Sequence, residues 1–244
     1  MGWRRRWLEF CRRIGAGGAA EEVFADLDRR YREPGRHYHT WAHVADCLQE
    51  LRRARPAPRE AAALKLAVWF HDAVYDPARQ DNEERSAALA ARWASALGLP
   101  PALSRQASRL ILATRHVGPD EPEGVANASA PGEPGEALLR DIDLAVLGGC
   151  WARFLRYERR IAREYSGLPR ERFRAGRAEL LRGFLRRPAL YSTPEFRRRF
   201  ERRARENLGR ALARLQRAKP RPAQRPGYRP APPRSDRPGA GPAP

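Results

Sequence analysis

Apolar side chains recur at helical spacing along this chain, and no segment shows the alternation of apolar and polar residues typical of a β-strand. This pattern predicts an all-α fold, a compact helical bundle without internal repeats. Glycines and prolines separate the apolar stripes and mark where helices end. The expected helices cover residues 3–14, 20–31, 41–54, 59–74, 83–97, 103–114, 136–147, 150–165, 170–185 and 194–218.

Two segments lack this periodicity. Residues 118–135 consist largely of Pro, Gly, Ala and Glu, a composition that favours a flexible surface insertion. Residues 219–244 hold nine of the 22 prolines and are expected to be a disordered tail. The chain of 244 residues is therefore expected to form a single helical domain over residues 1–218, followed by this tail.

The chain carries a formal net charge of +19, but only two of its 48 basic residues are lysines. Such a bias is what GC-rich coding would produce, so the charge alone identifies no partner. The tail holds six basic residues and one acidic residue, which leaves the helical part basic as well. Binding to nucleic acid through this basic surface is therefore one of the functions to consider.

Cys11, Cys47 and Cys150 are odd in number and form no CxxC pair, which favours core thiols in a reducing compartment. The chain begins without a signal-type apolar segment, and no run approaches the roughly 20 apolar residues of a spanning helix. Residue 6 is Arg6, so the myristoylation pattern also fails. We expect a soluble, cytoplasmic protein. Residues 3–14 are expected to pack on their own domain, the alternative being a basic helix on a membrane surface.

The stretch LAVWFHDAVYD, residues 66–76, places a histidine and an aspartate after an apolar run. Burying the unpaired carboxylate of Asp72 would be costly, and a divalent cation offsets that cost. A His/carboxylate metal site needs ligands from different elements, and His43 and Asp143 lie in neighbouring expected helices. These residues, with the adjacent His71 and Asp72, predict a metal site. Two histidines and two carboxylates suit Mn, Fe, Co, Ni or Zn, and Mg less well.

His43, His71-Asp72 and Asp143 resemble the H…HD…D pattern of the HD-domain superfamily of metal-dependent phosphohydrolases. The similarity covers about residues 20–215. Within the superfamily, the chain is most similar to an uncharacterised bacterial branch described as predicted HD-superfamily phosphohydrolases. The segments that carry it are 36–40 (RHYHT), 69–76 (WFHDAVYD), 81–87 (DNEERSA), Asp143-Leu144 with Leu147-Gly148, 163–165 (REY), Gly176-Arg177, Ala204-Arg205 and Asn207-Leu208.

The resemblance implies a compact helical HD fold and a divalent ion held by His43, His71, Asp72 and Asp143. Such an ion would lower the pKa of bound water and polarise a phosphate ester, so that hydroxide attacks phosphorus. Asp72 is thus expected to be both a ligand and a catalytic residue. Glu83 is expected to act as a general base or to hydrogen-bond to a metal ligand. The alternative is that its charge only stabilises the N-terminus of a helix through the helix dipole.

Four residues next to the ligand segments are expected to bind substrate phosphate: Arg36, His39, Arg115 and His116. For Arg36 and Arg115, the alternative is that the side chain lies on the solvated surface and does not contact the substrate. Relatives often have a second histidine directly after the position of His116, where this chain has Val117. The resemblance therefore does not decide between a site with one metal ion and a site with two. Asp141 is either a partner of the site or a mere neighbour. Arg163 and Tyr165 are expected to line the pocket.

The expected function is hydrolysis of a phosphate ester of a nucleotide or another small phosphorylated molecule. The alternative is a basic helical module that binds nucleic acid and keeps a structural or vestigial metal site. The sequence contains no P-loop, dinucleotide-binding glycine motif or GxSxG, which argues against those enzyme classes. Neither the substrate nor the oligomeric state follows from the sequence.

Overall fold

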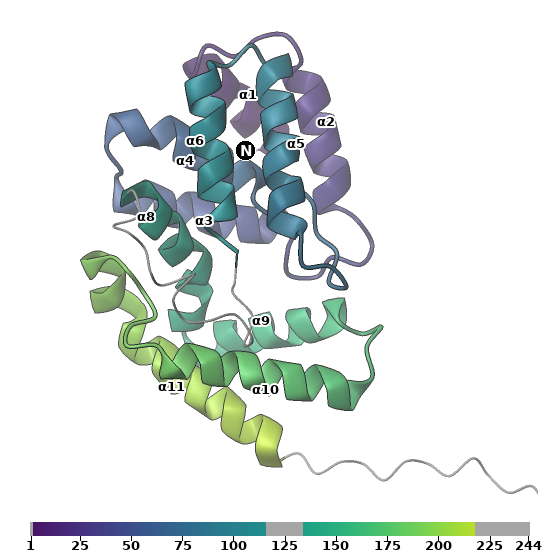
Figure 1. Cartoon of the computed structure of the whole chain (residues 1–244), viewed down its shortest axis with the longest axis vertical. Coiled ribbons are helices and arrows are strands. Elements are labelled where there is room, and N and C mark those ends of the chain that lie inside the picture. Colours follow the sequence, from purple (N-terminus) through teal and green to yellow (C-terminus); the bar gives the residue numbers. More distant parts are fainter. Residues whose placement is uncertain (1, 116–133, 218–244) are drawn as a thin grey trace, which may run out of the picture.

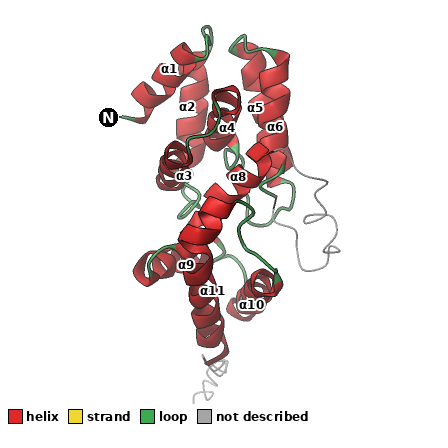
Figure 2. Ribbon diagram, turned by 90° about the vertical axis from the view of Figure 1, so that its left-hand side faces the viewer, coloured by secondary structure: helices red, strands yellow, loops and turns green. Residues whose placement is uncertain are grey.

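Residues 2–115 and 134–217 are described by the computed structural model, and over these residues the chain is helical, with no strand (Figures 1 and 2). The all-α prediction is confirmed. The helices are α1 (Trp3–Arg13), α2 (Ala20–Tyr31), α3 (Trp41–Ala54), α4 (Pro58–Phe70), α5 (Asn82–Ala96), α6 (Pro101–Leu112), α8 (Pro134–Leu144), the 3-10 helix η1 (Ala145–Gly148), α9 (Trp151–Glu164), α10 (Arg170–Arg186) and α11 (Pro194–Arg217).

The two segments without periodicity fall mostly outside the described residues. The expected tail, 219–244, lies wholly outside them. Of the expected insertion, residues 118–133 lie outside, whereas residues 134–135 already belong to α8. The boundary placed at residue 136 was therefore wrong by two residues.

Helix α1 packs on its own domain through its aromatic side chains. Trp7 is fully buried, and its ring meets that of Trp69 edge-on with centroids 5.3 Å apart. Trp3 stacks on Trp41 at 4.7 Å. Burial of each such ring stabilises the folded protein by a few kcal/mol. The apolar face of α1 is therefore buried against the rest of the protein. The expectation that this helix packs on its own domain is confirmed.

The His71-Asp72 pair lies at the end of α4 and not within it. The sequence predicted a helix through residue 74, but α4 ends at Phe70 and His71 is its C-cap. Beyond this end, the guanidinium of Arg36 donates hydrogen bonds to the carbonyl oxygens of Asp72 and Ala73. A buried cation thus holds the turn that follows α4.

Two groups of helices meet at α8 and η1. Helices α1–α6 form one group, and α9, α10 and α11 lie together at the other end of the molecule (Figures 1 and 2). Helix α8 contacts α3, α4 and α6, and η1 contacts α9 and α11. Asp143, one of the expected ligands, lies on α8, close to this junction.

The three cysteines are free thiols, but they are not all in the core. Cys11 and Cys47 are buried as expected, whereas Cys150 is exposed at the N-cap of α9. Its place in the core was wrongly predicted, because the apolar residues of α9 begin only after it. Over residues 2–115 and 134–217, every helix is too short or too polar to cross a lipid bilayer.

Candidate metal centre

The four expected ligands lie together although they come from distant parts of the sequence. His43 is on the first turn of α3, His71 and Asp72 follow α4, and Asp143 is near the end of α8. Both imidazoles are almost completely buried, with 2% of each side chain exposed, while the carboxylates of Asp72 and Asp143 are 19% and 15% exposed. The carboxylates thus form the side of the cluster that solvent can reach.

The donor atoms of these residues are spaced as ligands of one ion would be. Nε2 of His43 lies 3.0 Å from Nε2 of His71, 3.2 Å from Oδ2 of Asp72 and 3.1 Å from Oδ1 of Asp143. Nε2 of His71 lies 3.1 Å and 3.8 Å from the same two oxygens. Two donors about 2.1 Å from a common ion are about 3.0 Å apart at a right angle and about 3.4 Å apart at the tetrahedral angle.

The hydrogen bonds around the cluster leave its donor atoms available. Nδ1 of His71 lies 3.0 Å from the carbonyl oxygen of Val68. A carbonyl can only accept, so Nδ1 carries the proton and Nε2 presents a lone pair to the cluster. Oδ2 of Asp72 is buried, and the polar atoms near it are Nε2 of His43 and Nε2 of His71, at 3.2 Å and 3.1 Å. A buried carboxylate oxygen that faces two imidazole nitrogens is an arrangement that a cation would stabilise. The residues therefore fit a divalent ion.

The electrostatics of the cluster also favour a bound cation. Burial alone would lower the pKa of His71, but Asp72 and Cys47 raise it well above its usual value. Burial would raise the pKa of Asp72, yet His71, His39 and His43 hold it well below its usual value. The carboxylates thus attract positive charge, and a metal ion competes with protons for the imidazole nitrogens.

Cys47 adjoins this cluster and was not expected as part of it. It lies one turn after His43 on α3, and its Sγ is 3.6 Å from Nε2 of His43. Ligand atoms of His43, Cys47, His71 and Asp143 all lie within 4.8 Å of one another, so this group could hold a metal ion. The His-x-x-x-Cys spacing puts both side chains on one helix face, and this signal was available in the sequence.

Glu164, at the end of α9, organises the loop before α3. Its side chain is fully buried, and Oε1 accepts hydrogen bonds from the backbone N–H groups of His37, Tyr38 and His39 at 2.6–3.0 Å. Oε2 accepts hydrogen bonds from Nδ1 of His39 at 2.8 Å and from the hydroxyl of Tyr75 at 3.1 Å. The ring of His39 also stacks on Tyr75 with centroids 4.0 Å apart. His39 is thereby fixed beside the cluster, and its Nε2 is left for other partners.

Arg36 is engaged in holding the backbone near the cluster. Only 2% of its side chain is exposed. Besides the carbonyl groups of Asp72 and Ala73, its guanidinium donates to the carbonyl of His39 and to the Glu33 carboxylate. This geometry assigns Arg36 to positioning the His71-Asp72 turn, in place of the phosphate contact expected from the sequence.

The remaining expected site residues lie at the periphery or outside the described residues. Glu83 is half-buried in the first turn of α5. Arg115, past the end of α6, forms an ion pair of 3.3 Å with Glu84, and its side chain is 42% exposed. His116 lies outside the described residues.

The structure decides between the two readings of Asp141. Its carboxylate accepts hydrogen bonds from the backbone N–H groups of Ser192 and Thr193 and from the Thr193 hydroxyl, at 2.6–2.7 Å. Asp141 therefore holds the turn before α11 and is a structural neighbour of Asp143. Arg163 is exposed, and Tyr165 is half-buried against Phe173.

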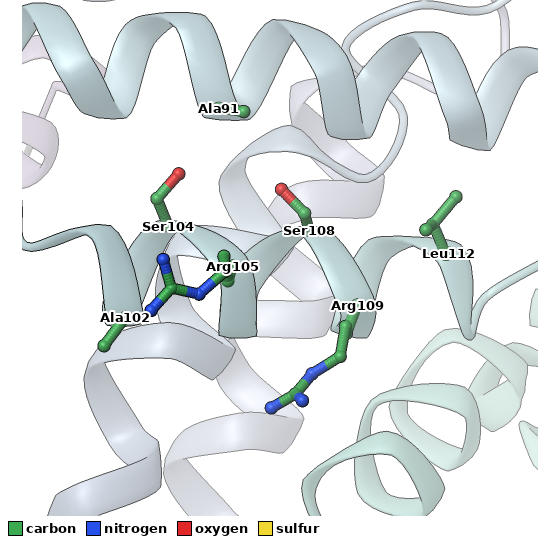
Figure 3. A pocket seen from close by; sticks show the side chains of 7 residues that line it. All are labelled: Ala91, Ala102, Ser104, Arg105, Ser108, Arg109 and Leu112. Atoms are coloured by element: carbon green, nitrogen blue, oxygen red, sulfur yellow. The ribbon is translucent and has the colours of Figure 1, made fainter.

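A groove of about 510 Å³ between α5 and α6 shares no residue with the metal cluster. Figure 3 shows its lining, in which Ser104 and Ser108 of α6 point toward the helix that carries Ala91, whereas Arg109 points away from it. The residues are Ala91, Ala102, Ser104, Arg105, Ser108, Arg109 and Leu112.

Comparison with known proteins gives no match for this chain among protein-family models, curated proteins or solved structures.

Proposed function

We propose that this protein is a metal-dependent phosphohydrolase of the HD-domain type that cleaves a phosphate ester of a nucleotide or another small phosphorylated molecule. The observation that carries the proposal is the convergence of His43, His71, Asp72 and Asp143, with their donor atoms 3.0–3.8 Å apart. The H…HD…D resemblance supports the same assignment.

The four residues would hold a divalent ion, of which Mn, Fe, Co, Ni and Zn match the mixed nitrogen and oxygen donors better than Mg. When bound, such an ion supplies Lewis acidity, which activates water and neutralises charge on a phosphoryl group. The hydrogen bond from His71 to Val68 keeps the imidazole in the tautomer that can bind metal.

His39 is the residue of the chain best placed to contact the substrate beside the ion. Glu164 fixes its ring, and 18% of its side chain is exposed. Nε2 of His39 would bind a phosphate oxygen or protonate the departing alcohol. Glu83 remains a candidate general base at the start of α5, and Arg115 and His116 remain candidate phosphate contacts.

The test combines metal content with hydrolysis on the same tag-free samples. Wild type, the double variant H71A/D72A and the control H37A are measured by elemental mass spectrometry and with p-nitrophenyl phosphate and bis-p-nitrophenyl phosphate. His37 lies in the same loop but offers only its backbone N–H to Glu164, so H37A should retain both metal and activity.

We expect about one ion or two per chain and measurable hydrolysis in wild type, with both lost in the double variant. Folded wild type that takes up no Mn, Co, Ni or Zn and hydrolyses neither ester would refute the proposal. Metal binding without hydrolysis, even with a panel of nucleotides, would leave only a structural metal site.

A further inference from the structure

The positive charge of this protein is concentrated at one end of the fold. Residues 1–150 contain 21 basic and 21 acidic residues, whereas residues 151–217, which span α9, α10 and α11, contain 21 arginines and seven acidic residues. A coding bias toward arginine over lysine would affect both regions alike. It does not explain why acidic residues balance the first region and not the second.

Within α9–α11, several arginines meet at one corner. Rings of Tyr165 and Phe173 lie 5.7 Å apart and join the end of α9 to the start of α10. Arg174 donates a hydrogen bond to the carbonyl of Leu215, which joins the start of α10 to the end of α11. Figure 1 shows these helices together at one end of the molecule. The exposed arginines brought together here, called the basic corner, are Arg163, Arg170, Arg172, Arg214 and Arg217.

The basic corner is not neutralised by the described part of the protein. None of its five guanidinium groups forms an ion pair with a carboxylate of residues 2–115 or 134–217. Other arginines of the same helices do, as Arg177 does with Glu158 and Arg205 with Glu201. Glu171 is the acidic residue in the first turn of α10 and offsets one of the five charges. Clustered like charges cost stability, and a polyanionic partner removes that cost.

We infer that the basic corner binds the phosphodiester backbone of nucleic acid, independently of base sequence. Arginine forms bidentate hydrogen bonds to phosphate, and several guanidinium groups on neighbouring helix ends match the repeated charge of a polynucleotide. The large apolar side chains exposed in the described residues are Leu112 and Leu168, and only Leu168 lies near the corner. A single leucine does not make the apolar face that membrane-surface binding requires.

This inference goes beyond ester hydrolysis and does not depend on it, because the basic corner contains no expected metal ligand. One residue of the corner, Arg163, directly precedes Glu164, the residue that holds His39, in the sequence.

The test is the binding of a fluorescein-labelled mixed-sequence DNA duplex of about 20 base pairs, followed by anisotropy from about 50 to about 200 mM salt. Full-length wild type is compared with R163Q/R170Q/R172Q/R214Q/R217Q. The matched control, R12Q/R13Q/R52Q/R92Q/R105Q, removes five exposed arginines from α1, α3, α5 and α6. Circular dichroism melting verifies that the variants are folded.

With about 0.9 counterions released per phosphate contact, five contacts contribute about −4.5 to the slope of log K against log salt. The corner variant should lose most of this contribution and at least tenfold in affinity at low salt. The control should change affinity by less than about threefold, because it alters only long-range charge.

Three results would overturn the inference: no binding by wild type at about 50 mM salt, equal losses in the corner variant and the control, or corner-dependent binding to phosphatidylserine vesicles without binding to the duplex. None of these results bears on hydrolysis of the small esters. Loss of metal and activity in H71A/D72A with unchanged duplex binding would separate the two sites.

Discussion

Glu164 and His39 are 125 residues apart in sequence, and their side chains are joined by a hydrogen bond of 2.8 Å from Nδ1 to Oε2. The same carboxylate accepts three backbone N–H groups of the loop that leads into α3. Helix α9 therefore fixes both the course of this loop and the orientation of a histidine beside the candidate metal centre.

Glu164 should make the stability of the protein depend on acid pH. Burial would raise the pKa of this carboxyl, but hydrogen bonds from His39 and the backbone lower it to about 2. Since the pKa is lower in the folded protein than in the unfolded chain, the stabilisation is complete above about pH 4.5 and is lost as the pH falls to about 2. It amounts to about 3 kcal/mol.

The measurement is urea unfolding of wild type and E164Q between neutral pH and pH 2. The amide keeps an oxygen for the backbone N–H groups but cannot ionise. Wild type should be more stable at neutral pH, and its advantage should shrink as the pH falls below 4.5. A difference that stays constant over this range would contradict the assignment.

Arg36 should act on stability and metal retention and not on substrate affinity. R36Q removes a buried cation that binds the carbonyl groups of Asp72, Ala73 and His39, which should cost about 2–4 kcal/mol and loosen the turn that carries the expected ligands His71 and Asp72. R32Q is the matched control, because Arg32 is exposed and pairs with Asp28 on the same helix, so its loss should cost below about 1 kcal/mol.

Unfolding free energy and metal content distinguish the two arginines. If Arg36 instead binds substrate phosphate, R36Q will keep both quantities near wild type and raise KM with little change in kcat.

Much of the fold could be predicted from the sequence, because each apolar stripe at helical spacing became a helix. The end of α4 could not. The apolar pattern continues to Val74, but the helix ends at Phe70, and the carbonyl of Asp72 in the turn beyond it is bound by Arg36, 36 residues earlier than Asp72. The turn is held by this tertiary contact, and local periodicity carries no information about it.

The same distinction applies to the candidate site. The convergence of His43, His71, Asp72 and Asp143 was expected from residue types and resemblance, and the structure brings them together; their role as ligands stays a prediction. Glu164 could not be identified as the organiser of the loop, because a lone glutamate at the end of a helix resembles a solvated charge. Its function is visible only from the backbone N–H groups that surround it.

Gly148 should tolerate no side chain, since it packs directly against Phe200 of α11. A Cβ at position 148 would lie 2.5 Å from Cβ and 2.9 Å from Cα of Phe200. G148A should destabilise the protein by about 1–3 kcal/mol, because the backbone of one helix must move. In contrast, Gly209 lies inside α11 with no atom within 4 Å of an added Cβ.

G209A should therefore stabilise the protein by about 0.5–1 kcal/mol through its helix propensity. Urea unfolding of the two variants measures both effects. Equal changes in the two glycine variants would mean that η1 and α11 are not in close contact.

Cys47 should bind the metal ion through its thiolate. Its Sγ lies 3.6 Å from Nε2 of His43. A sulfur about 2.3 Å and a nitrogen about 2.1 Å from one ion are about 3.6 Å apart at the tetrahedral angle. Burial would raise the pKa of Cys47, but His43 and His71 lower it below its usual value, which favours the thiolate. A soft ligand would make the site prefer Zn or Co over Mg.

Titration with Co²⁺ tests this directly, because a thiolate bound to cobalt gives a charge-transfer band in the near ultraviolet. Wild type and C150S should show the band, since Cys150 is exposed and is not among the clustered donor residues His43, Cys47, His71 and Asp143. C47S should lack it while still binding cobalt through the remaining residues. If the band is absent from wild type, or if C47S keeps it through another thiolate, the thiol of Cys47 only packs against His43. A site that lacks the band would consist of imidazole and carboxylate alone, and its preference for Zn over Mg would be correspondingly weaker.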